Sequence, residues 1–174
     1  MTHITLVGMP GSGKSSTAAA LSAASGLLLR DVDEIAAGAI GLPVAQAIRE
    51  HGEAAFRDAE AEGLAAVLDG EPAAVACGAG AVLAPVCRAL LRRAGVVTVW
   101  LTATEETVAV RLASSRQDRP LLDTPGAYGR LWHERRRHYL SVADVVVATD
   151  RRTPTEVARL VMGRVGIAVA EANP

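Results

Sequence analysis

The sequence has few lysines, few aromatic residues and no long apolar run. Lys14 is the only lysine among the eighteen lysine and arginine residues, so it alone can supply a flexible point charge where a planar guanidinium would not serve. Aromatic residues make up 3% of the chain although 50% is hydrophobic, which predicts a core of small, closely packed side chains. The net charge of −1 gives no sign of a surface that binds nucleic acid or an anionic membrane.

Other features that the sequence lacks bear on the location of the protein in the cell and on the state of its cysteines. No apolar stretch approaches the roughly eighteen residues of a membrane-spanning helix, and the N-terminus leads directly into a predicted strand. We therefore expect a cytoplasmic protein without a targeting segment. Cys77 and Cys87 lack the companions of a metal site, so we expect free thiols, with a disulfide as the less favoured alternative. A length of 174 residues predicts a single domain, residues 1–174.

The stretch from Gly8 to Ser15 has the spacing G-x-x-x-x-G-K-S of a phosphate-binding loop. A buried strand is predicted over 4–7 and a helix over 16–24, an order that disfavours a chance glycine-rich turn. Backbone N–H groups and the positive end of the helix would surround a phosphate, so this is a nucleotide-binding protein. We expect Lys14 to reach the β- and γ-phosphates and Ser15 to bind Mg²⁺. The predicted nucleotide-binding residues of the loop are Gly11, Ser12, Gly13, Lys14, Ser15 and Ser16.

Strands and helices are predicted to alternate along the rest of the chain. This alternation predicts an α/β fold with three layers, in which helices cover both faces of a central parallel sheet, expected to have five strands. Ligands bind at the carboxyl ends of such strands. The further strands are expected near 27–33, 73–77, 96–101 and 144–148, and the further helices near 43–50, 53–68, 85–93, 104–112, 127–140 and 154–165.

Two groups of charged residues lie at the end of the predicted strand 27–33 and in the predicted helix 53–68. Asp31 and Asp33 alternate in a stretch that we expect to be extended, so both should face the ligand, one towards Mg²⁺ and one towards the attacking hydroxyl. The alternative is that the pair caps the next helix. Glu53, Arg57 and Glu60 share one helix face, either as a solvated ladder of ion pairs or as part of the ligand site.

Arginines also mark the second half of the chain. Arg135 shares a helical stripe with Tyr128, Leu131, Trp132 and Tyr139, so it should face inwards. A buried arginine needs an anionic partner from the protein or from a ligand, unless it only lays its stem across apolar surface.

The polar stretch 113–126 is predicted to be a mobile lid. Arg111, Arg116 and Arg119 bracket it, and we expect one or more of them to contact the triphosphate when the lid closes. A generic charged loop is the alternative, but the sequence Arg119-Pro120-Leu121-Leu122 favours a lid.

Taken in order, these motifs resemble the shikimate kinase family, small P-loop kinases of the nucleoside-monophosphate-kinase-like group. The resemblance extends from Leu6 to about Pro154 and implies a P-loop kinase fold with a substrate-binding helical region at about 33–62 and a lid at about 113–126. The matching segments are the phosphate loop, Asp31-Val32-Asp33, Gly52-Glu53-Ala54-Ala55-Phe56-Arg57 with Glu60, Arg119-Pro120-Leu121-Leu122, and Glu134-Arg135 with Tyr139 and Ala143-Asp144.

The resemblance implies phosphorylation of the 3-hydroxyl of shikimate by ATP with Mg²⁺, on the route to chorismate. It gives Asp33 the role of base or orienting group, with Lys14 and Arg119 as the other catalytic residues. Arg57 and Arg135 would clamp the substrate carboxylate. Asp31 would assist Mg²⁺ together with Ser15. The substrate pocket would be lined by Gly78, Ala79 and Gly80. Contacts with ATP would come from Arg111, Arg119 and Pro154.

The sequence departs from the family pattern at three places. Ala79 replaces the middle glycine of a triple glycine and would be strained if its φ were positive. Ala36 replaces a glutamate, and the lid is one residue longer than is common. A kinase of another small hydroxylated acid, such as gluconate, is the alternative function, and a nucleotide-binding module without kinase activity is a more distant one. We expect a monomer, with a weak dimer left open.

Overall fold

A computed structural model describes residues 2–113 and 126–168 of the chain. Its sheet has five strands, all parallel, in the order β2-β3-β1-β4-β5. The predicted α/β fold with a five-stranded parallel sheet is therefore confirmed. The strands are β1 (His3–Val7), β2 (Leu28–Asp31), β3 (Ala73–Ala76), β4 (Val96–Thr102) and β5 (Val145–Ala148).

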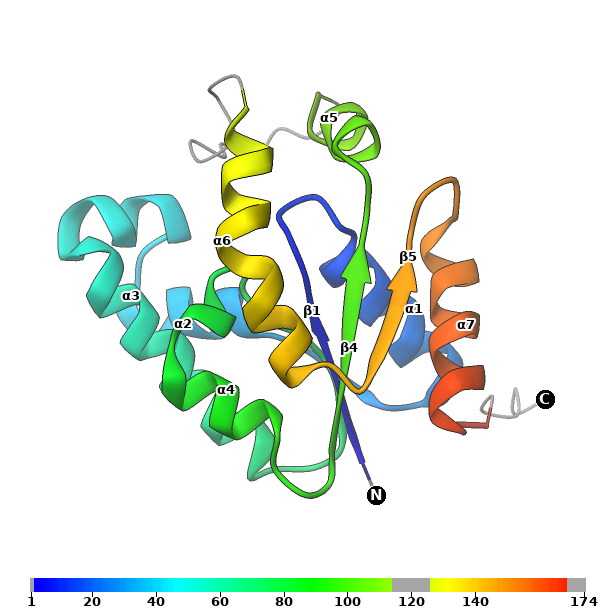
Figure 1. Ribbon diagram of the computed structural model, residues 1–174. Helices are drawn as coiled ribbons and strands as arrows, with labels where there is room; N and C mark the ends of the chain where they lie inside the picture. The colour runs from blue at the N-terminus through cyan, green and yellow to red at the C-terminus, as the bar shows by residue number, and fades with distance from the viewer. Residues whose placement is uncertain (1, 114–125, 169–174) are drawn as a thin grey trace.

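Helices cover both faces of this sheet (Figure 1). Helices α1 and α7 lie on one face, while α3, α4 and α6 lie on the other, which makes the three layers that the sequence predicts. The helices are α1 (Lys14–Ser25), α2 (Val32–Ile40), α3 (Val44–Leu68), α4 (Pro85–Leu91), α5 (Glu105–Ala113), α6 (Ala127–Val142) and α7 (Pro154–Val165), with a 3₁₀ turn, η1, at Ala81–Leu83.

Side chains along the strands alternate between the two faces, as the pleat requires. Ile4 and Leu6 of β1 pack towards α1 and α7, whereas Val7 packs towards α3, α4 and α6. Buried alanines of β3, such as Ala74 and Ala76, let α1 approach the sheet closely. The predicted core of small side chains is thus found, particularly on the face that carries α1 and α7.

Helix α2 was not predicted, and its presence corrects the expectation of an extended stretch from Asp31 to Asp33. Strand β2 ends at Asp31, and the Asp31 carboxylate caps α2 by accepting the backbone N–H of Asp33 at 3.1 Å. Asp33 is therefore a residue of the first helical turn. The alternative interpretation, a cap, is correct for Asp31. The signal was an aspartate followed by Glu34 three positions later, which is typical of a helix N-terminus.

Helix α3 contains a break where the sequence predicts a gap between two helices. Gly52 has φ 84° and ψ 159°, and an added side chain would be strained at such a φ. The first half of α3 and the first turn after the break pack with α2 around a small core of their own, formed by Ala36, Ala47 and Phe56. The break lets the second half of α3 continue towards the sheet from that small unit.

Within the described residues, no helix combines the length and the apolar character needed to cross a membrane. Cys77 and Cys87 are buried and not bonded to each other, which confirms free thiols. Burial raises the pKa of Cys87 to about 11, so this thiol stays protonated at neutral pH.

Candidate active site

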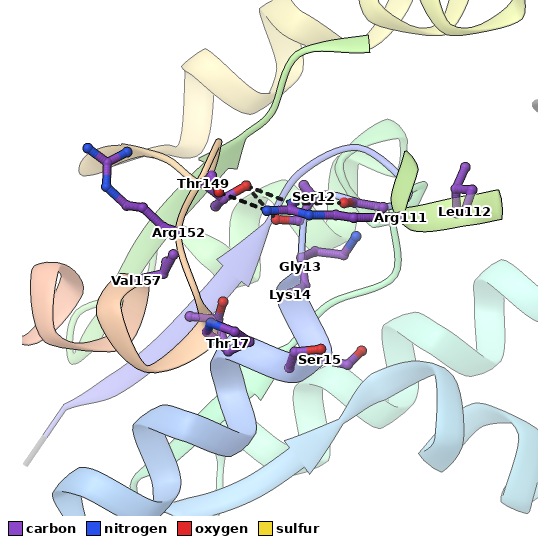
Figure 2. A pocket seen from close by; sticks show the side chains of 13 residues that line it. Ser12, Gly13, Lys14, Ser15, Thr17, Arg111, Leu112, Thr149, Arg152 and Val157 are labelled. Atoms are coloured by element: carbon purple, nitrogen blue, oxygen red, sulfur yellow. Dashed lines mark hydrogen bonds between the residues drawn. The ribbon is translucent and has the colours of Figure 1, made fainter. Parts of the chain in front are cut away.

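The phosphate loop joins β1 to α1 at the carboxyl edge of the sheet and opens onto a cavity of about 400 Å³ (Figure 2). Gly8 must lack a side chain, because a Cβ there would collide with the carbonyl of Leu101. The Lys14 ammonium donates to the carbonyls of Gly8 at 3.0 Å and Met9 at 3.1 Å. The cavity is lined by Gly11, Ser12, Gly13, Lys14, Ser15, Ser16, Thr17, Arg111, Leu112, Thr149, Arg152, Pro154 and Val157.

Two oxygen-bearing side chains meet at the start of α1. The hydroxyl of Ser15 donates to Oδ2 of Asp31 at 2.7 Å. A hydroxyl and a carboxylate are ligands that suit Mg²⁺, which takes one or two protein carboxylates and completes its shell with water and phosphate oxygens. Residues 2–113 and 126–168 contain no cluster of three or more His, Cys, Asp or Glu that could hold a metal by itself, as expected for such a site.

Arg111 ties the phosphate loop to the end of β5 (Figure 2). Its Nη1 donates to the Gly11 carbonyl at 3.2 Å and to Oγ1 of Thr149 at 2.9 Å, and its Nη2 donates to the Thr149 carbonyl at 2.7 Å. The Thr149 hydroxyl is also within 3.1 Å of the Ser12 carbonyl. Thr149 was missed in the sequence, although it directly follows a predicted strand at the edge where ligands bind.

On the other side of the loop, residues of α2 and α3 converge on the segment that follows β3. A Cβ at Gly78 would collide with the carboxylates of Glu60 and Asp33, and a Cβ at Gly80 would collide with the guanidinium of Arg57. These glycines are therefore needed for close packing. Strand β3 pairs with β1, and the N–H of Cys77 donates to the Leu6 carbonyl at 3.0 Å, so this second group of residues adjoins the phosphate loop.

Arg57 forms ion pairs with two glutamates of its own helix. It pairs with Glu53 at 2.9 Å and with Glu60 on the next turn. Glu53 is exposed, but the side chain of Glu60 is only 1% exposed. The interpretation as a solvated ladder is therefore wrong for Glu60.

Glu60 is a buried carboxyl group next to another carboxylate. Burial, together with the adjacent Asp33, raises the pKa of Glu60 to about 8, against the opposing effect of the Arg57 guanidinium. Its Oε1 has no hydrogen-bond donor among the described residues. Both facts have one explanation: a proton shared between the two carboxyl groups would supply the missing donor, so the folded protein favours the protonated form of Glu60 more than water does.

Arg135 of α6 is 3% exposed, as the inward-facing stripe predicts. Its Nη1 donates to the Ala79 carbonyl at 3.3 Å, and its Nε has no hydrogen-bond partner within 2–113 and 126–168. No carboxylate in the described part of the chain forms an ion pair with it. Since the whole head group is buried, the alternative that only the stem packs is wrong. A buried guanidinium needs an anionic partner, and no carboxylate of the described residues supplies one as an ion pair.

Tyr139, one turn further along α6, completes this group. Its hydroxyl donates to the same Ala79 carbonyl at 2.7 Å, and its ring stacks on Trp100 with centroids 5.5 Å apart. Ala79 is not strained, because Arg151 (φ 54°) is the only described residue other than glycine with a positive φ. Arg116 and Arg119 lie outside the described residues, as does nearly all of the predicted lid.

Known proteins are similar to this chain in sequence and in fold. The sequence profile of the shikimate kinase family matches residues 10–165. Shikimate kinases of Streptomyces coelicolor and Salinispora arenicola are 40% and 39% identical over 164 and 155 residues, which span 93% and 88% of this chain and 94% and 91% of theirs. In structure, a shikimate kinase from Acinetobacter baumannii in complex with shikimate aligns with a TM-score of 0.87 at 23% identity, over 95% of this chain and 93% of the other. The chain belongs to the shikimate kinase family.

Proposed function

We propose that this kinase transfers the γ-phosphoryl group of ATP to the 3-hydroxyl of shikimate and that its site has two sides. The observation that carries the assignment is the convergence of two arginines from different helices on residues 78–80. Arg57 packs over Gly80, and buried Arg135 reaches Ala79 without pairing to a carboxylate of the described residues. Two arginine forks around one loop suit a rigid substrate that carries a carboxylate.

On the nucleotide side, the phosphate loop would hold the triphosphate through backbone N–H groups of Gly11 to Ser16. Lys14 now binds carbonyls of its own loop and would exchange them for β- and γ-phosphate oxygens. Arg111 and Pro154 border the same cavity and would lie against the adenine. Arg152, which also lines it, is an addition to the sequence-based set.

On the acceptor side, Asp33 would orient the attacking hydroxyl and accept its proton. Arg57 and Arg135 would bind the carboxylate and so fix the ring relative to the γ-phosphate. Catalysis would come mainly from this positioning and from charge stabilisation, as in other phosphoryl transfers. Helix α2 and helix α3, within the region 33–62, would thus form the substrate-binding part.

Ser15 and Asp31 would hold Mg²⁺. When bound, the ion supplies positive charge between the phosphate oxygens. The chain's own contribution is to keep the Ser15 hydroxyl and the Asp31 carboxylate together, which the 2.7 Å hydrogen bond between them already does.

Arg119 would bind both phosphate and substrate from the lid at 113–126, and lid closure would exclude water. This role stays a prediction from the sequence, since Arg119 lies outside the described residues.

The first test is release of ADP from Mg-ATP in a coupled assay with shikimate, with gluconate and without acceptor. We expect a rate only with shikimate. A rate with gluconate instead would identify a kinase of another hydroxylated acid, and nucleotide binding without any acceptor-dependent rate would identify a binding module.

The second test addresses the carboxylate clamp. Arg135→Ala should abolish shikimate turnover, a loss of at least about a thousandfold because one partner of a buried charge pair is removed, while ATP affinity stays unchanged. Arg136→Ala, at the neighbouring exposed position, is the matched control and should retain the wild-type rate. Unchanged turnover in Arg135→Ala would contradict the assignment.

A further inference from the structure

The carbonyl of Ala79 accepts two hydrogen bonds from α6, and the two are unequal. The Tyr139 hydroxyl lies at 2.7 Å and Nη1 of Arg135 at 3.3 Å. Both side chains are buried, Tyr139 completely and Arg135 to 3% exposure. A carbonyl oxygen has two lone pairs, so it is fully satisfied here, with one short bond and one long bond.

The long bond is the one that must break if Arg135 binds a ligand. Because its Nε lacks a hydrogen-bond partner among the described residues, the guanidinium has an N–H group that is left to bind an anion. The Ala79 carbonyl is partly buried, so the loss of its only donor would cost free energy. Whether Arg135 can leave at low cost therefore depends on what else satisfies the Ala79 oxygen.

We propose that Tyr139 is a positioning residue for capture of the substrate carboxylate: its hydroxyl keeps the Ala79 carbonyl satisfied while Arg135 exchanges that carbonyl for the carboxylate. The proposal rests on the proposed role of Arg135 as part of the clamp. In the free enzyme both Arg135 and Tyr139 donate to the Ala79 carbonyl. In the complex Tyr139 would be the only one of the two that donates to it.

The surroundings of Tyr139 suit this role. Stacking on Trp100, with an angle of 19° between the rings, fixes the ring and therefore the direction of the hydroxyl. Burial raises the pKa of Tyr139 above its ordinary value, so the hydroxyl remains a donor across the working pH range. The Ala79 carbonyl lies between Gly78 and Gly80, whose close packing against Asp33 and Arg57 leaves little room for the loop to move.

Tyr139→Phe is the direct test, because it removes the hydroxyl and keeps the stacked ring. Arg135 would then be the only donor to the Ala79 carbonyl among the described residues, and its departure would leave a partly buried acceptor without a protein donor. We expect the KM and the Kd for shikimate to rise about tenfold, with kcat and the KM for ATP within about twofold of wild type. Equal changes in both KM values, or no change in either, would overturn the proposal.

The matched control is Tyr128→Phe on the same helix. The Tyr128 hydroxyl donates to the Ala103 carbonyl at 2.5 Å, so this variant also loses one phenol-to-carbonyl hydrogen bond, at a site away from residues 78–80. Its KM for shikimate should equal that of the wild type. A tenfold rise in Tyr128→Phe as well would mean that loss of any such bond on α6 has the effect, and the proposal would fall.

Two further measurements separate this proposal from the proposed function and from a folding defect. If Arg135→Ala keeps its affinity for shikimate, the clamp itself is wrong; if it loses that affinity while Tyr139→Phe does not, only the role of Tyr139 is wrong. A crystal structure of the wild-type enzyme with shikimate needs no variant. It should show Tyr139 still bonded to the Ala79 carbonyl and Arg135 bonded to the carboxylate, and an Arg135 that remains on Ala79 would overturn the proposal.

Discussion

At the scale of single residues, the site contains two ionisable side chains whose charged forms are disfavoured by burial. Arg135 is a buried cation that pairs with no carboxylate of the described residues, and Glu60 is a buried carboxyl group beside Asp33. Isolated charges of this kind cost several kcal/mol unless they are paired or neutralised. In the proposed function a ligand carboxylate would pair with Arg135, and for Glu60 the raised pKa favours the protonated form.

The raised pKa of Glu60 predicts that stability depends on pH. Its pKa is raised from 4.5 to about 8 in the folded protein, so between these values the folded state holds a proton that the unfolded state has lost. Raising the pH through this window therefore favours unfolding, and the effect levels off above about pH 8. We expect the free energy of unfolding, measured with urea, to fall between pH 5 and pH 8 in the wild type and to fall less in Glu60→Gln.

The glutamine variant is suitable because its amide imitates the protonated carboxyl group, donating to Asp33 and accepting from Arg57. Glu53→Gln is the matched control: Glu53 also pairs with Arg57 but has a side chain that is 57% exposed, so its removal should leave the pH dependence of the wild type unchanged. Parallel curves for the wild type and Glu60→Gln would show that Glu60 ionises normally.

At the scale of elements, the sequence predicted every strand and most helices, because strands and helices alternate and the phosphate loop fixes the first unit. It did not predict α2. The carboxylates of Asp31 and Asp33 alternate, which favoured an extended interpretation over the cap signal of Asp31 and Glu34. The side chains of Asp31 and Asp33 still reach the site, one beside Ser15 and one beside Gly78, but through a helix cap and a first turn.

Two glycines of α7 allow a prediction about helix stability. Gly163 lies inside the helix, where a Cβ would meet no heavy atom within 4 Å, whereas Gly166 ends the helix with φ 70°. Gly163→Ala should stabilise the protein by about 0.5–1 kcal/mol, because alanine loses less backbone entropy in a helix. Gly166→Ala should destabilise it by about 1 kcal/mol, because alanine is strained at positive φ.

Urea unfolding of both variants measures these effects, and neither should alter the KM for shikimate, since α7 lies on the opposite face of the sheet from α3 and α6 (Figure 1). A loss of stability in Gly163→Ala would mean that α7 is packed differently at that position.

At the scale of the whole molecule, the sequence placed the site at the carboxyl edge of a parallel sheet but could not give the strand order. Neighbours such as β3 and β1, or β1 and β4, are set by long-range packing that local patterns do not encode. The hydrogen bonds of Arg111 to Gly11 and Thr149 and the pairing of Glu60 with Asp33 depend on that order. They bring together residues that have no common motif.

The parts of the fold also differ in how many buried apolar residues they contain, and this difference leads to a last prediction. The sheet is buried between two large apolar clusters. By contrast, α2 and the part of α3 around the break at Gly52 share a small core of three buried residues, Ala36, Ala47 and Phe56. Regions with few buried apolar contacts open at a lower free energy than the rest of the molecule. In the free enzyme, amides at 33–52 should exchange with solvent about a hundredfold faster than those of β1 and β4.

Shikimate should slow this exchange, because Asp33 at the start of α2 and Arg57 after the break at Gly52 would bind one ligand together with Arg135 on α6. A ligand that binds only the folded arrangement of these elements stabilises it, by an amount that grows with the logarithm of the ligand concentration above its Kd. Hydrogen exchange followed by mass spectrometry should therefore show protection of 33–52 on addition of shikimate to the wild type and none in Arg135→Ala. Uniformly slow exchange in the free enzyme would show that the small core is as stable as the sheet. Protection that persists in Arg135→Ala would show that Arg57 and Asp33 hold the substrate without the α6 arginine.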